Sequence, residues 1–172
     1  MISPKPVKLI TGFIFKNEPV LIRAEYFLKR MFGKSDYESE ILAFAHTDYY
    51  EKEFGRGLSR KFISFQRLID PRNLPSVKLS AGKIEKKLSG GANRNINIDP
   101  GYLDLAKLVL ATTKDFTHRI YLDRGIFAEV TLFCEGKGFK PWQWTYPDYK
   151  TEEYIAIFNK IRSIYAEQIK TG

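Results

Sequence analysis

Apolar residues recur every three or four positions in three segments of the chain, and this spacing predicts three amphipathic helices. The first follows Asn17, a residue suited to capping a helix, and ends at Gly33. The second carries its apolar stripe over residues 77–88. The third is capped by Thr151 and carries its stripe over residues 154–165. Each helix therefore has one face to bury against a neighbouring element.

Short runs dominated by apolar residues and bounded by turn signals predict the strands. These runs cover residues 8–15, 41–50, 58–69, 94–99, 105–112, 118–122 and 126–133. The last two runs flank Asp123-Arg124-Gly125 and predict a hairpin. Pro100-Gly101 is interpreted as a turn that ends the run at residues 94–99.

The order of these elements predicts the fold class. A strand–helix–strand–strand–helix–strand series is followed by a β-meander and a final helix. This order predicts an α+β fold, in which an antiparallel sheet has its helices mainly on one face. The first six elements match a ferredoxin-like core. No linker or repeat divides the sequence, so we expect residues 1–172 to form a single domain.

Composition supports a compact core and argues against several classes of protein. Of the 172 residues, 44% are apolar and 15% are aromatic, which favours one substantial core over disorder. No apolar run approaches the roughly 20 residues that a membrane span needs. The N-terminus lacks the pattern of a signal peptide, and Cys134 has no second cysteine to pair with. We therefore expect a cytoplasmic protein without a membrane partner.

The positive charge is concentrated in one segment. Residues 52–94 hold eleven Lys or Arg against three acids, a surplus equal to the formal charge of +8 of the whole chain. Such a surplus is typical of a surface that binds polyanions such as RNA, although an ordinary solvated basic face is the alternative. The common nucleotide cradles are missing, because Gly82-Lys83 lacks the other residues of a P-loop and no G-x-G-x-x-G sequence occurs.

Metal ligands are few in this sequence. One cysteine and two histidines, His46 and His118, cannot build a structural zinc site. The carboxylates of Asp48, Asp99 and Glu129 lie in strand-like segments of low charge and are the candidates for holding a Mg²⁺ or Mn²⁺ ion. The alternative is that each carboxylate caps a turn or pairs with a nearby arginine.

The segment Arg94–Asp99 carries an unusual row of polar residues. On a strand, Asn95, Asn97 and Asp99 point to one face, although amide and carboxylate side chains are poor strand formers. This pattern predicts a row that faces a ligand, with Arg94 holding phosphate, Asn97 orienting the ligand and Asp99 acting as a catalytic base. The alternative is an edge strand with one wet face.

Residues 113–119 combine a histidine with two cations. His118 is predicted to be the catalytic acid or base, because histidine is the usual residue for that role, while Lys114 and Arg119 are predicted to hold phosphate oxygens. If this run forms a strand, His118 and Arg119 point to opposite faces and need a bulge to share one pocket. The alternative is a loop with a hydrogen-bonded histidine.

Aromatic residues accompany these polar segments. Residues 142–149 form either a stacking platform for bases or a packing surface that joins the last helix to the sheet. We expect Tyr49 and Tyr146 to contact a ligand, and Tyr102 to help Asn97 to orient it.

Four motifs follow one another along the chain. They are Thr47-Asp48-Tyr49-Tyr50, Asn97-Ile98-Asp99-Pro100-Gly101-Tyr102, Thr112-Thr113-Lys114-Asp115 with His118-Arg119-Ile120-Tyr121, and Trp144-Thr145-Tyr146-Pro147-Asp148-Tyr149. Through them the chain resembles, over nearly its full length, a bacterial family catalogued as a domain of unknown function, number four-four-one-six. Some members carry a GTP-binding label, and the resemblance brings no assigned catalytic residue to this sequence.

These observations lead to one expected function and two alternatives. We expect a protein that binds a phosphate-containing ligand, either a nucleotide or RNA, with metal-assisted phosphoester hydrolysis as the simplest chemistry. The first alternative is a non-catalytic RNA-binding module that uses residues 52–94. The second is a scaffold that docks a partner through its aromatic C-terminal segment. The expected function requires Asp48, Asp99 and His118 to converge on one cleft with cations at its rim.

Overall fold

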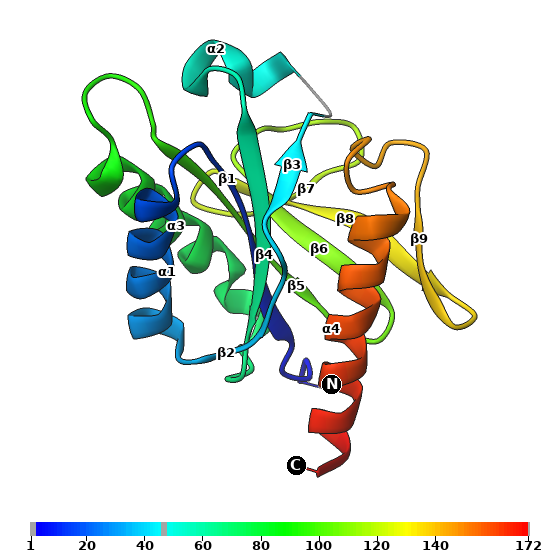
Figure 1. Ribbon diagram of the computed structural model, residues 1–172. Coiled ribbons are helices and arrows are strands. Elements are labelled where there is room, and N and C mark those ends of the chain that lie inside the picture. The colour runs from blue at the N-terminus through cyan, green and yellow to red at the C-terminus, as the bar shows by residue number, and fades with distance from the viewer. Residues whose placement is uncertain (1–2, 46–47, 172) are drawn as a thin grey trace.

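The computed structural model describes residues 3–45 and 48–171, which form one sheet with helices on both faces (Figure 1). The strands are β1 (Lys8–Phe15), β2 (Ser35–Glu38), β3 (Leu42–Phe44), β4 (Leu58–Phe65), β5 (Ile96–Leu103), β6 (Lys107–Thr112), β7 (Ile120–Asp123), β8 (Ile126–Glu135) and β9 (Gly138–Pro141). The helices are α1 (Glu18–Phe32), α2 (Glu51–Phe54), α3 (Leu74–Leu88) and α4 (Glu152–Thr171), with short 3₁₀ turns η1 (Asp48–Tyr50) and η2 (Pro71–Asn73). Within these described ranges, no helix combines the length and the apolar content that crossing a membrane requires.

The strands pair in an antiparallel manner, with β1 in the interior of the sheet. The sheet order is β2-β4-β1-β5-β6-β8-β7, while β3 also pairs with β4 and β9 with β8. The portion β2-β4-β1-β5, connected through α1 and α3, has the arrangement of a ferredoxin-like core. The predicted α+β class, the antiparallel sheet and this core are therefore confirmed.

Side chains alternate along the central strands and divide the apolar core between two faces. Leu9, Phe13 and Phe15 of β1 pack with α1 and α3 on one face. Ile10 of β1 lies on the other face, where it packs with Phe62 and with the apolar stripe of α4. Two of the three long helices thus share one face, and α4 covers part of the other (Figure 1).

The prediction of one strand over residues 41–50 was wrong. The structure has the three-residue strand β3, followed after the undescribed pair 46–47 by η1 and α2. The aromatic residues that suggested a longer strand pack together instead, because Tyr50 lies against Phe44 and Phe54 with ring centroids 5.9 and 6.0 Å away. Strand β2 was missed, since its four residues are mostly polar and give no apolar signal.

The predicted turn at Pro100-Gly101 was also wrong, because β5 continues to Leu103. Pro100 lies opposite Thr11 of β1, and the pairing of β5 with β6 begins only at Gly101. A proline is tolerated at such a position because one side of the strand has no partner there. The continuous strand keeps Asn97 and Asp99 on the sheet face that α4 partly covers.

Turn and capping residues at the ends of helices and strands predicted some of the observed contacts and not others. The hairpin at Asp123-Arg124-Gly125 is confirmed, with positive φ angles of 49° at Arg124 and 76° at Gly125. Thr151 caps α4 as predicted, since its hydroxyl oxygen accepts a hydrogen bond from the Tyr154 amide at 3.3 Å. Asn17, in contrast, precedes α1 without a side-chain capping bond.

Glu38 of β2 gives the fold a pH-dependent contact. Burial opposes its ionisation, but hydrogen bonds from Lys29, Ser35 and Lys61 outweigh this effect and hold the pKa of Glu38 at about 2. Because the folded pKa lies below the ordinary value of 4.5, the contact stabilises the fold above that pH and is lost as the pH falls towards 2.

We therefore expect Glu38→Gln to lower the free energy of unfolding by about 1 kcal/mol at pH 7, and by less at pH 3. Urea unfolding of both proteins at the two pH values measures this difference. Glu167→Gln, which removes an exposed ion pair on α4, is the control and should show no comparable pH trend. A Glu38→Gln effect that is equal at both pH values would contradict the assignment.

Candidate functional site

A cavity of about 630 Å³ opens on the sheet face that carries Asn97 and Asp99. Its charged lining comprises four cations and three carboxylates, namely Arg60, Lys78, Arg94, Lys114, Asp99, Glu129 and Asp148. Its aromatic lining comprises Phe44, Tyr49, Tyr50, Tyr146 and Tyr149. The described lining therefore has a surplus of one positive charge and several aromatic rings.

Arg60 is the most deeply buried charged group of this cavity, with 1% of its surface exposed. Its Nη2 donates a hydrogen bond to the Tyr149 hydroxyl at 2.8 Å. The carboxylates of Asp99 and Asp148 lie 3.6 and 3.5 Å from the guanidinium group. Nε and Nη1 of Arg60 make no hydrogen bond of normal length within the part of the chain that the structure describes, although Nη1 is the atom paired with Asp99 and Tyr154 also interacts with the guanidinium group. Arg60 therefore lines the cavity with donor capacity beyond its hydrogen bond to Tyr149.

Burial keeps the phenol groups around Arg60 neutral. It raises the pKa of Tyr149 well above its ordinary value and that of Tyr154 to about 12, although the charge of Arg60 acts in the opposite direction. Burial also raises the pKa of Tyr50. The charge of Arg60 is consequently balanced by carboxylates and not by phenolates.

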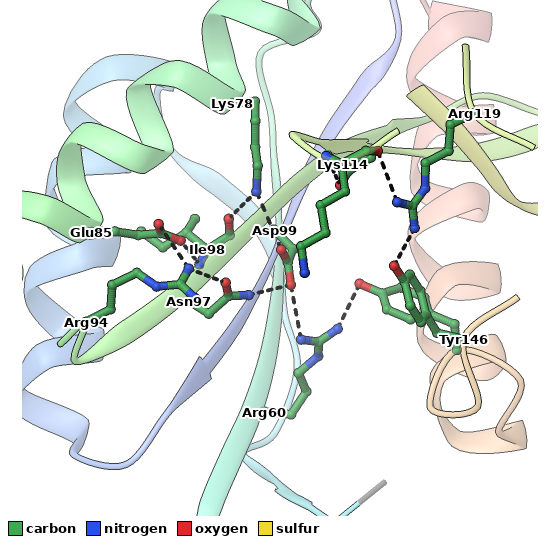
Figure 2. A network of polar contacts seen from close by, with 12 residues as sticks. Arg60, Lys78, Glu85, Arg94, Asn97, Ile98, Asp99, Lys114, Arg119 and Tyr146 are labelled. Carbon is green, nitrogen blue, oxygen red and sulfur yellow. Dashed lines mark hydrogen bonds and ion pairs between the residues drawn. The ribbon is translucent and has the colours of Figure 1, made fainter. Parts of the chain in front are cut away.

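Asp99 connects the cations of the cavity (Figure 2). Its Oδ2 accepts a hydrogen bond from Asn97 Nδ2 at 2.7 Å and lies 3.6 Å from Arg60 Nη1, while its Oδ1 lies 3.6 Å from Lys78 Nζ. Figure 2 shows Lys78 and Arg60 approaching Asp99 from opposite sides. Asp99 therefore holds the two cations in place, and a catalytic role for it stays a prediction.

Arg94 lines the cavity but is largely neutralised by protein carboxylates. Its Nε and Nη2 each donate to Glu53 at 2.8 Å, and these hydrogen bonds lower the pKa of Glu53. Its Nη1 donates to Asn97 Oδ1 at 2.8 Å and lies 3.4 Å from Glu85. Arg94 thus fixes the Asn97 side chain that in turn donates to Asp99.

Lys114 and Arg119 belong to a turn-rich segment that precedes β7. Arg119 donates through Nη1 to the Lys114 carbonyl at 3.0 Å and through Nη2 to the Tyr146 hydroxyl at 2.6 Å (Figure 2). Lys114 Nζ donates to the Tyr49 hydroxyl and lies 4.4 Å from the centre of that ring. This series of contacts links Tyr49 and Tyr146, so four residues predicted to bind a ligand form one connected group.

His118 and Arg119 converge on Glu129 and do not point to opposite faces, because both precede the strand. His118 Nε2 and Arg119 Nε lie 3.0 and 2.9 Å from the same carboxylate oxygen of Glu129. Glu129 lines the cavity, whereas His118 is not part of that lining and stacks on Trp144 with ring centroids 5.4 Å apart. His118 therefore reaches the cavity only through Glu129.

The aromatic segment 142–149 combines stacking and packing. Trp142 and Trp144 stack at 5.0 Å with an angle of 11° between their planes. Tyr149 is buried and lies parallel to Phe158 of α4 at 5.7 Å, so the packing interpretation is confirmed for this end of the segment. A base-stacking role for the tryptophans stays a prediction.

Some predicted residues lie elsewhere. Tyr102 points to the opposite face of β5 and packs against the α1 and α3 side of the core, so it cannot orient a ligand beside Asn97 in this cavity. The Asn95 side chain donates to the Leu88 carbonyl at the end of α3, away from the polar row. The side chain of Asp48 and the whole of His46 lie outside the described residues.

The site residues predicted from the sequence do not include several polar residues of the cavity, among them Arg60, Lys78, Asp148 and Tyr149. A signal existed for Arg60, because an arginine that alternates with Leu58 and Phe62 on one strand face is unusual. The sequence contains no comparable signal for Lys78, since a lysine on a helix is ordinarily solvated.

The described residues contain no cluster of ligands that supports the predicted Mg²⁺ or Mn²⁺ site. Among the residues with described side chains, no three His, Cys, Asp or Glu groups come close enough together to hold an ion. Asp99 and Glu129 both line the cavity, but cations contact each of them. A Mg²⁺ or Mn²⁺ site that includes Asp48 stays a prediction.

The basic segment 52–94 does not form one surface. Arg60, Lys78 and Arg94 line the cavity, whereas Lys61 pairs with Glu25 and Glu38. The remaining exposed cations include a group on the outer side of α3, namely Lys83, Lys86 and Lys87. The structure therefore divides the charge between an internal site and an outer face.

Comparison with known proteins gives a family but no activity. A family model described as "Domain of unknown function (DUF4416)" matches residues 5–165. No curated protein and no solved structure matches the chain. The family match agrees with the resemblance drawn from the four sequence motifs.

Proposed function

Because the chain belongs to the DUF4416 family, whose description names no activity, we propose a function from the cavity itself. The protein binds a small phosphate-containing ligand there, of about the size of a nucleotide. The observation that carries this proposal is Arg60, a buried guanidinium group that lines the cavity and whose Nε and Nη1 make no hydrogen bond of normal length to a described residue. A phosphate oxygen satisfies such donors with charge-assisted hydrogen bonds.

The other cations of the cavity support an anionic ligand. Lys114 lines the cavity and donates a hydrogen bond to the Tyr49 hydroxyl, and no carboxylate partner of Lys114 is found among the contacts of the described residues. Lys78 lies 3.6 Å from Asp99, a carboxylate that it shares with Arg60. Among the described residues, these three cations have two carboxylate partners between them, Asp99 and Asp148, and this imbalance favours a ligand that brings further negative charge.

The size and the aromatic residues of the cavity favour a nucleotide-like molecule over a bare phosphate ion. A volume of about 630 Å³ lies within the range of about 300–1,000 Å³ that is usual for small-molecule sites. Tyr49 and Tyr146 line the cavity while keeping 60% and 45% of their surface exposed. Partly exposed tyrosine side chains next to cations suit a planar ring that is attached to a phosphate.

Isothermal titration calorimetry with a nucleoside 5′-diphosphate and the matching free nucleoside tests this function. We expect the diphosphate to bind at least about tenfold more tightly than the nucleoside, and Lys114→Gln to remove about tenfold of that affinity through the loss of a charged donor. Lys137→Gln, at an exposed turn outside the cavity, is the matched control and should leave the affinity unchanged.

Equal affinity for the nucleoside, or a Lys114→Gln variant that binds like the wild type, would contradict the proposal. Tight binding of an RNA oligonucleotide that survives Lys114→Gln and falls steeply with salt would favour the RNA-binding module instead. Phosphoester hydrolysis stays a prediction from the sequence. Assaying the same samples for released phosphate, with and without Mg²⁺ or Mn²⁺, checks it.

A further inference from the structure

The outer side of the α1–α3 layer carries a groove that the proposed function does not use. It has a volume of about 390 Å³ and lies between the two helices. Its apolar lining comes from Phe27, Met31 and Ile84, and its cations are Arg30, Lys83 and Lys87. These helices cover the sheet face opposite to the one that carries Asn97 and Asp99. The groove is therefore separate from the cavity.

The fold removes negative charge from this face. Helices α1 and α3 contain three acids, but Glu25 and Glu85 are each only 8% exposed. Glu25 pairs with Lys61 at 2.7 Å, and Glu85 accepts a hydrogen bond from the Ile98 amide at 2.6 Å. The exposed cations of the two helices are Arg23, Arg30, Lys83, Lys86 and Lys87, while only Glu18, in the first turn of α1, is an exposed acid. The face is thus complementary to an acidic partner.

Exposed apolar groups distinguish this face from a simple polyanion site. Ile22, Tyr26 and Met31 project from α1, and Met31 keeps 45% of its surface exposed beside the groove. The two aromatic rings nearby are contacted by cations, since Lys87 Nζ lies 4.3 Å from the Phe27 ring and Arg30 lies 5.8 Å from the Tyr26 ring. A groove lined by Met31, Ile84 and a Phe27 ring that Lys87 already contacts suits an apolar side chain of a protein better than a stacked base.

We propose that this face binds an acidic segment of a partner protein. One large apolar side chain of the segment occupies the groove between Phe27, Met31 and Ile84. Flanking carboxylates pair with Arg30, Lys83 and Lys87. The apolar contact provides the burial, and the charges provide orientation and discrimination between partners.

Fluorescence anisotropy with a labelled glutamate-rich peptide tests this proposal. The peptide carries two leucines four positions apart, so that both lie on one side of a helix. We expect the double variant Lys83→Glu with Lys87→Glu to weaken its binding at least about tenfold, because two attractive contacts become repulsive. The control Lys137→Glu with Lys170→Glu makes the same charge change at exposed positions on other elements and should alter binding less than about twofold.

Three results would overturn the proposal. The first is equal binding of a peptide that has serine in place of both leucines, because the groove would then have no part in recognition. The second is an RNA oligonucleotide of similar length that binds more tightly than the peptide and whose binding is lost in the same double variant. This result would assign the face to a polynucleotide. Absence of any anisotropy change with the leucine peptide would exclude the acidic partner. Diphosphate binding should be unchanged in the double variant, so this experiment is independent of the cavity.

Discussion

Replacing Arg60 by methionine is expected to lower the free energy of unfolding by about 3–5 kcal/mol, because it leaves two carboxylates without their buried counter-charge. Asp99 and Asp148 lie 3.6 and 3.5 Å from the guanidinium group, and the Tyr149 hydroxyl loses its donor at 2.8 Å. Methionine fills much of the volume but supplies neither charge nor hydrogen bonds. Urea unfolding monitored by circular dichroism measures the loss.

Arg56 provides the matched control for this substitution. Its side chain is 92% exposed, and its ion pair with Glu51 is long, at 3.8 Å. Arg56→Met should therefore change the free energy of unfolding by no more than about 0.5 kcal/mol. Adding Asp99→Asn and Asp148→Asn to Arg60→Met should restore part of the loss, since neither carboxylate then lacks its arginine, and the recovery is incomplete because Lys78 loses its pairing with Asp99. A loss below about 1 kcal/mol for Arg60→Met alone would contradict the buried ion-pair cluster.

Replacing Gly101 by alanine is the second substitution with a large expected effect. A Cβ atom at this position would lie 2.3 Å from the Val109 carbonyl oxygen and 2.8 Å from Leu110 Cδ2. The first of these atoms is backbone of β6, so no rotamer change relieves the clash and strands β5 and β6 must separate locally. We expect a loss of about 3 kcal/mol in the free energy of unfolding, with a lower melting temperature.

Gly82 in α3 is the corresponding control. A Cβ atom there meets nothing within 4 Å, and its backbone does not have a positive φ. Gly82→Ala should therefore stabilise the protein by about 0.5–1 kcal/mol through its higher helix propensity. Calorimetry measures the stability of the Gly101→Ala and Gly82→Ala variants. A Gly101→Ala protein as stable as the wild type would show that β5 and β6 are farther apart than described.

The sequence predicted the regular part of this fold better than its irregular part. The three amphipathic helices and most of the apolar strands give strong periodic signals, and these elements are confirmed, with the run at residues 41–50 as the exception. The errors fall where long-range contacts decide the local structure. Pro100-Gly101 has the local signature of a turn, yet pairing with β1 keeps it in a strand. The polar strand β2 exists because β4 offers it a partner.

In the candidate site too, residues with a local sequence pattern were predicted, and residues that depend on long-range contacts were not. Asn97, Asp99 and Lys114 were predicted from local patterns, and the structure brings them to one cavity. The most deeply buried charged residue, Arg60, was not predicted, because its importance comes from Asp99 and Asp148, which lie far away in the sequence. Tyr102 was misplaced, because the strand continued where a turn was expected and carried its side chain to the other face.

The most direct test of the phosphate-binding cavity is a crystal structure of the protein soaked with tungstate, a heavy tetrahedral oxyanion that resembles phosphate. Anomalous scattering from tungsten locates the ion without ambiguity. The account predicts a peak in the cavity, with at least one oxygen within hydrogen-bond distance of Arg60 Nη1 or Nε. Peaks found only beside the exposed lysines of α3, with none near Arg60, would contradict it.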